Sequence, residues 1–163
     1  QPQFSRARAQ ACDAAHIDAN DEKAWAILAT ADNYLGMYME ATDALGHVRR
    51  QDRSTWQVAY QWARAEAGQN NAAQTLDWAN RSALTAQSAI ASLHLLRASA
   101  LLAVGSYSQS ADELEIYLQL LDRNAPEREG LMRELHRLRE LAQNRGASQA
   151  VTGDAPGYNA LAN

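Results

Sequence analysis

The side chains that could carry out chemistry in this chain are its four histidines, its one cysteine and its carboxylates. The histidines, His16, His47, His94 and His136, lie far apart on different predicted helices, so their spacing predicts no metal site. Cys12 is the only cysteine, which excludes an internal disulfide. Its small neighbours favour a buried core thiol over a nucleophile.

The carboxylates and glycines form no catalytic motif either. Groups such as Asp112, Glu113 and Glu115 are typical of charges on solvated helix faces, and no general acid–base pair can be argued from them. The glycines stand singly, so no Gly-rich phosphate loop exists. We therefore expect a protein that is not an enzyme and that holds no cofactor and no metal.

Charge and hydropathy exclude two further classes of partner. The net charge is −4 and the charges are mixed, with no basic block that would mark a nucleic-acid-binding surface. No run of 18 apolar residues is long enough to span a bilayer. We expect neither a nucleic acid nor a membrane among the partners.

The residues that remain must be positioned by helices. No proline occurs from Phe4 to Ala125, which suits helices because proline in a helix interior costs roughly 3 kcal/mol. β-Branched residues are sparse and never alternate with polar ones over the length of a strand. The sequence therefore predicts an all-α fold.

A repeated pattern surrounds three glycines, Gly36, Gly68 and Gly105. Each follows a helical stretch and precedes a second helix, and the glycines lie 32 and 37 residues apart. A period near 34 residues indicates a helical solenoid. Spacings of three and four within the helices predict a core, whose members are Trp25, Leu28, Tyr38, Ala41, Leu45, Leu101, Tyr107, Leu114 and Tyr117.

The first unit, from about Glu22 to Thr55, resembles the tetratricopeptide repeat family. The resemblance lies in Trp25-x-x-Leu28-Ala29 and in Gly36-x-Tyr38-x-x-Ala41, and the third unit matches at Ala98, Leu101, Gly105, Tyr107 and Ser110. The departures are Asp32 in place of an aromatic residue, Arg53 in place of proline and Arg97 in place of leucine. The resemblance implies a right-handed α-α superhelix built from helical hairpins.

The resemblance divides the chain into units of unequal quality. They are a half repeat at 2–20, repeats at about 22–55, 55–87 and 88–125, and a capping helix at 126–145, which together make one domain, 1–146. The register of the middle unit stays open, because Gly68 falls one residue late and alignment on it puts Asn70 at the position of the aromatic wedge. Asn144-Arg145-Gly146 predicts a stop, and 147–163 reads as a flexible tail.

The family's usual geometry implies a non-catalytic scaffold whose first helices line a concave groove for a segment of a partner protein. Carried over by position, the groove residues are Lys23, Thr30, Asn33, Tyr34, Trp62, Arg64, Leu95, Ser99 and Leu102, with Gln61 in place of Trp62 in the other register. The polar members Lys23, Asn33, Tyr34 and Arg64 are the stronger candidates. Ala26 and Thr30 stand where the family's carboxylate clamp needs Lys and Asn, which argues against that role.

The alternative is a structural spacer or a dimerisation module. The half repeat would expose an apolar edge, which a second copy could cover through residues 4–17. The compartment stays open. The Asp-Arg-Asn-Ala-Pro-Glu stretch before the last predicted helix resembles exported bacterial repeat proteins and slightly favours export.

Overall fold

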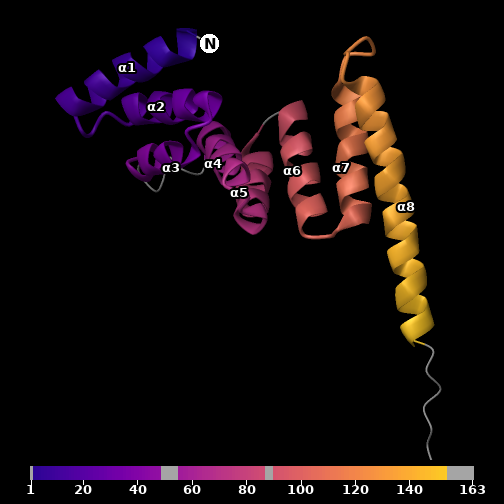
Figure 1. The fold of residues 1–163 in the computed structure, drawn as a ribbon. Helices are drawn as coiled ribbons and strands as arrows, with labels where there is room; N and C mark the ends of the chain where they lie inside the picture. Colours follow the sequence, from indigo (N-terminus) through magenta and orange to yellow (C-terminus); the bar gives the residue numbers. More distant parts are fainter. Residues whose placement is uncertain (1, 49–54, 87–89, 154–163) are drawn as a thin grey trace, which may run out of the picture.

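The structure is a computed structural model that describes residues 2–48, 55–86 and 90–153, with residues 146–153 described by their backbone alone. The described chain is all-α and contains eight helices (Figure 1). They are α1 (Pro2–Ile17), α2 (Glu22–Leu35), α3 (Tyr38–Gly46), α4 (Trp56–Gly68), α5 (Ala72–Thr85), α6 (Ala91–Ala103), α7 (Tyr107–Leu120) and α8 (Arg128–Gly153). Arg53, repeat boundaries 87 and 88, and tail residues 154–163 lie outside the described residues.

The helices pack in the order in which they occur in the chain. Each contacts the next one, from α1 on α2 through to α7 on α8, as expected of an array of helical hairpins. Two further contacts join helices of successive units, because α2 also contacts α4 and α4 also contacts α6. In Figure 1, α6, α7 and α8 lie side by side, and α8 extends beyond α7.

The turns inside the hairpins fix the register of the repeat. Gly36 and Gly105 have φ of +78° and +76°, so both turns use the left-handed conformation that glycine adopts most easily. Gly68 is not a turn residue, because it is the last residue of α4 and Asn70 takes the left-handed position with φ of +61°. Asparagine tolerates this conformation better than most residues. The three turn residues are thus 34 and 35 residues apart.

This register answers the question left open for the middle unit. The second helix of each hairpin begins two residues after the turn residue, at Tyr38, Ala72 and Tyr107. Asn70 is therefore not the aromatic wedge, and the wedge position of the middle unit holds Ala72. Seven residues before each turn, all three units bury an alanine; these alanines are Ala29, Ala63 and Ala98.

The predicted helix faces are confirmed by the core. Leu28, Ala41, Leu45 and Leu114 are buried, and Leu45 has no exposed surface. The larger predicted core residues are only half-buried: Trp25, Tyr38, Leu101, Tyr107 and Tyr117. A thin array of hairpins has little interior, so bulky rings keep one edge at the surface.

Two departures from the repeat pattern are explained by buried ion pairs. Asp32 is 1% exposed, and Arg8 of α1 donates from Nε to its Oδ1 at 2.5 Å. Burial raises the pKa of Asp32, although the hydrogen bond and the charge of Arg8 work against that rise. Arg97 lies 2.9 Å from Glu113, a buried residue, so the prediction that Glu113 lies on a solvated face is wrong.

The last helix differs from the prediction at its end. It continues through Gly146 to Gly153, so the predicted stop at Asn144-Arg145-Gly146 is wrong. The tail predicted from 147 therefore overlaps α8 as far as Gly153, and its flexibility stays a prediction. An apolar stripe of this helix faces α7: Leu138 is buried, and Leu131 and Leu135 pack beside it. Arg145 donates to the carbonyl of Gly105 and lies over the Tyr107 ring, so α8 is still attached to the α6–α7 hairpin beyond that stripe.

The turn at Gly36 yields a stability prediction. Gly36→Val should lower the free energy of unfolding by about 1–3 kcal/mol, because a side chain at positive φ is strained. Space is not the cause, since a Cβ at Gly36 would have no atom within 4 Å. Gly46 has equally open space without the positive φ, so Gly46→Val is the matched control. Urea unfolding measures both, and equal losses would contradict the assignment of this turn.

Candidate partner-binding face

The candidate site is the side of α2, α4 and α6 that carries most of the predicted binding residues, which we call the first-helix face. The three helices are the first members of their hairpins, and they contact one another in the order α2, α4, α6. Side chains on successive helices can therefore act on the same bound segment. The arrangement predicts a surface that spans several hairpins.

The best-defined feature of this face is a stack of three side chains from three helices. The Tyr34 ring, at the end of α2, lies parallel to the Phe4 ring of α1 with 4.3 Å between centroids and 7° between planes. The Arg64 guanidinium of α4 lies 4.1 Å from the same Tyr34 centroid. Both groups contact the same ring, which therefore has two packing partners while Tyr34 remains 44% exposed.

The stack presents hydrogen-bond donors without acceptors. Among the described residues, no carboxylate pairs with Arg64 and nothing accepts a hydrogen bond from the Tyr34 hydroxyl. An arginine stacked on a ring keeps its N–H groups free in the guanidinium plane, where they match a carboxylate. The stack can therefore bind an acceptor-rich, anionic group.

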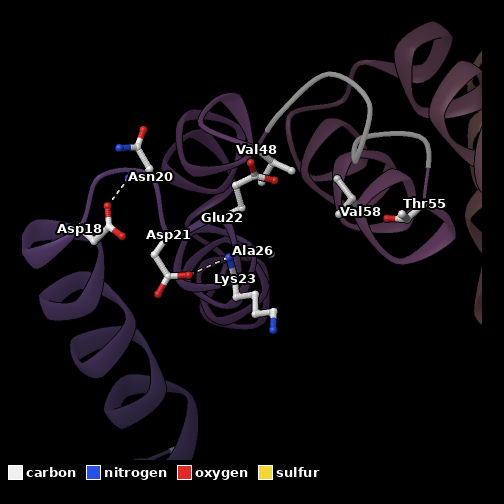
Figure 2. A pocket seen from close by; sticks show the side chains of 9 residues that line it. All are labelled: Asp18, Asn20, Asp21, Glu22, Lys23, Ala26, Val48, Thr55 and Val58. Carbon is white, nitrogen blue, oxygen red and sulfur yellow. Dashed lines mark hydrogen bonds between the residues drawn. The ribbon is translucent and has the colours of Figure 1, made fainter.

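A second feature is a hollow at the start of α2, shown in Figure 2. It has a volume of about 600 Å³, and its lining consists of Asp18, Asn20, Asp21, Glu22, Lys23, Ala26, Val48, Thr55 and Val58. The Asp21 carboxylate accepts from the backbone N–H groups of Lys23 and Ala24, which caps α2 and fixes this wall. The ammonium group of Lys23 has no partner among the described residues.

Asn33 does not lie on the open face. It is 2% exposed and donates from Nδ2 to both the carbonyl and the side-chain oxygen of Gln61, each at 2.9 Å. Asn33 therefore joins α2 to α4, and its buried amide is not placed to contact a partner, contrary to its selection as one of the stronger candidates. Thr30 is half-buried and donates its hydroxyl proton to the carbonyl of Ala26.

The apolar candidates separate into packed and open residues. Trp62 stacks on Trp78 of α5 with 5.1 Å between centroids and also packs against the buried cluster of the first hairpin, so it is an interior residue. Leu102 packs against the core formed by α6, α7 and α8. Leu95 is 37% exposed, and Ser99 is exposed on the same helix. Of the three candidates on α6, Leu95 and Ser99 lie open.

Sequence reasoning missed a smaller cavity between the second and third hairpins. It has a volume of about 150 Å³ and is lined almost entirely by small side chains: Ala67, Asn70, Ala72, Thr75, Ser99, Ala100 and Ala103. Only Ser99 was a predicted site residue. Once the turn is placed at Asn70, the alanine at position 72 is the sequence feature that could have predicted this cavity.

The edge expected to support a homodimer is mostly polar. The exposed side chains of α1 are mostly polar and include Gln3, Ser5, Arg6, Gln10, Asp13 and His16. Ala11 packs against α2 in a buried cluster with Leu28, whereas Ile17 at the end of α1 is 89% exposed. Self-association through residues 4–17 stays a prediction, and Ile17 is the large apolar side chain that α1 exposes for it.

Neither further groups of described side chains nor comparisons with known proteins identify a family for this chain. Within the described ranges, no three histidine, cysteine or acidic side chains gather as metal ligands. None of the helices of the described chain has the length and apolar character needed to cross a membrane. No model of a protein family matches the chain, and comparison with curated proteins finds no significantly similar sequence.

Proposed function

We propose that residues 1–146 form a non-catalytic scaffold that binds a segment of a partner protein across the first-helix face. The proposal includes a tetratricopeptide-like array in which a half repeat precedes three hairpins and α8 closes the end. Sequential packing of the helices and turns 34 and 35 residues apart support it. In such an array the hairpins wind as a right-handed superhelix, and the first helices line its concave side.

The observation that carries this proposal is the pairing of Tyr34 with Arg64. These residues come from successive first helices, and both were expected to bind a partner. The Tyr34 ring and the Arg64 donors are preorganised, because Phe4 stacks on Tyr34 and the Arg64 guanidinium lies over the same ring. A group ordered in this way loses little conformational entropy when it binds. If Tyr34 and Arg64 only stabilised the fold, we would expect them to form hydrogen bonds within the protein. Neither side chain forms one among the described residues.

The chemistry of the face indicates what it binds. Arg64 and Lys23 are cations without carboxylate partners among the described residues, so an extended or helical segment with an acidic residue fits best. Leu95 adds an apolar contact. Affinity should be modest, because a flexible segment loses entropy when it docks.

The test uses peptides selected from a random displayed library on the immobilised chain. For a selected peptide, the double variant Tyr34→Phe with Arg64→Gln should bind at least about tenfold more weakly, since hydrogen bonds to charged groups contribute about 1.5–3 kcal/mol. Tyr34→Phe keeps the ring on Phe4, so the stack should survive. Calorimetry measures both dissociation constants.

The matched control is Glu40→Ala with Asp43→Ala, two exposed positions on α3. This variant should bind the same peptides within about twofold of the unaltered chain. Equal loss in both variants, or loss only in the α3 variant, would contradict binding on the first-helix face. Selection of no peptide at all would contradict the scaffold function.

A further inference from the structure

Neighbouring units of the array contact each other at equivalent positions, and we call each such contact a seat. A seat is formed by two residues. One is the wedge residue, which begins the second helix of a unit, and the other lies two positions before the turn of the next unit. At the first junction, this pairs Phe4 with Tyr34, whose rings stack. At the second, it pairs Tyr38 with Gly68, where an added Cβ would overlap the Tyr38 ring.

The last junction is also filled by a ring. Tyr107 occupies the wedge position of the third hairpin, and Arg145 of α8 lies over it with 5.8 Å from Cζ to the ring centroid. An aromatic side chain therefore sits at three of the four junctions in the described chain. The seats differ in what covers the ring, which is tyrosine, glycine or arginine.

The remaining junction, between the second and third hairpins, has no ring. Its wedge position is Ala72, and the residue two places before the next turn is Ala103. Both line the cavity of about 150 Å³, together with Thr75 and Ser99. The cavity thus lies at the one seat where the repeat's aromatic side chain is replaced by a methyl group.

We propose that this cavity binds an aromatic side chain of the partner segment, a proposal that rests on the proposed function. Three observations favour a ring over other groups. The equivalent seats of the same chain hold rings, a cavity of this size accommodates a benzene-sized group, and the walls are mostly alanine methyl groups. Ser99 places the cavity on the first-helix face, so a segment bound there can insert the ring.

Two of the three polar side chains in the lining have satisfied donors, and the third, Asn70, is exposed to solvent. The Thr75 hydroxyl donates to the carbonyl of Asn71 at 2.9 Å, and the Ser99 hydroxyl donates to that of Leu96 at 2.9 Å. Their protons are therefore already bound, and a ring that displaces solvent leaves these donors satisfied. A phenylalanine or tyrosine side chain meets these conditions.

The first measurement needs no partner. Benzene and N-acetyl-phenylalaninamide are titrated into the ¹⁵N-labelled full chain, and amide shifts are recorded. Saturable shifts are expected at Thr75, Ser99 and Ala103, while amides of α3 should not move. Absence of saturable shifts at the cavity, or equal shifts over the whole chain, would overturn the proposal.

The second measurement fills the seat from within. Ala72→Tyr with Ala103→Gly reproduces the Tyr38–Gly68 pair and should abolish the probe-induced shifts. The matched control is Ala73→Tyr with Ala103→Gly, because Ala73 is the next residue along α5 and is exposed. That control should still bind both probes. Probe binding retained in the filled variant, or lost in the control as well, would overturn the proposal.

A third variant covers the case in which the filled chain does not fold. Ser99→Leu changes an exposed position at the cavity and should weaken probe binding at least about tenfold by blocking access. Unchanged probe binding in this variant would contradict the assigned site. The probes also separate the two proposals: if they bind while selected peptides ignore Tyr34 and Arg64, the seat stands and the proposed function fails. If peptides need Tyr34 and Arg64 while the probes do not bind, the proposed function stands and the proposed aromatic seat is wrong.

Discussion

Leu45→Ala is expected to lower the free energy of unfolding by about 2–5 kcal/mol. Leu45 has no exposed surface and belongs to the cluster that joins α1, α2 and α3. Removal of its side chain costs the transfer free energy of the lost atoms and leaves a cavity in a thin core that has few neighbours to fill it. Urea unfolding followed by circular dichroism measures the change.

The control for Leu45 is Leu84, the same residue type on the second helix of the next unit. Leu84 is 86% exposed, so Leu84→Ala should change the free energy of unfolding by less than about 0.5 kcal/mol. A loss at Leu45 no greater than that at Leu84 would show that the helix faces are assigned wrongly.

Gly68→Val should also destabilise the chain, by about 1–3 kcal/mol. Gly68 ends α4 directly against the Tyr38 ring, and any Cβ there would overlap that ring, so α3 and α4 would have to separate. The cause is contact between two units and not backbone strain, because Gly68 lacks the positive φ of the turn glycines.

A double-mutant cycle identifies that cause. In a Tyr38→Ala background the clash disappears, so Gly68→Val should cost much less there than in the unaltered chain. The cycle should give a coupling free energy of at least about 1 kcal/mol. Equal costs in both backgrounds would mean that Gly68 does not make the contact between the first two hairpins.

The sequence predicts the hairpins well where turn chemistry and hydrophobic period agree. Gly36 and Gly105 carry both signals, and the period-three-and-four spacing places Leu45 and Leu114 in the core. The prediction is wrong for the middle unit, because glycine has two structural roles. Gly68 permits a close approach of helices, whereas Asn70 supplies the left-handed turn, and composition alone does not separate these roles.

The candidate site is predicted in part for a similar reason. The repeat position indicates which helix carries a residue, and it correctly brings Tyr34 and Arg64 together. Whether a polar side chain faces solvent depends on its neighbour in the next unit. Gln61 of the next unit accepts a hydrogen bond from the buried amide of Asn33. Such contacts between hairpins are absent from a pattern read one repeat at a time.

The end of the last helix shows a further limit of local signals. Asn144-Arg145-Gly146 has the residues of a helix stop, yet α8 continues to Gly153. Arg145 is used in another way, because its guanidinium reaches back to Gly105 and Tyr107. Glycine in a helix costs only about 1 kcal/mol, which neighbouring turns can offset.

The central claim is that a partner segment binds the first-helix face, and it is tested most directly by mapping where a selected peptide sits. A saturating amount of the tightest selected peptide is added to the ¹⁵N-labelled full chain, and amide shifts are assigned by residue. We predict that the largest shifts cluster on α2, α4 and α6, around Tyr34, Arg64 and Ser99. Largest shifts on the second helices α3, α5 and α7, or on the polar outer side of α1, would contradict the claim.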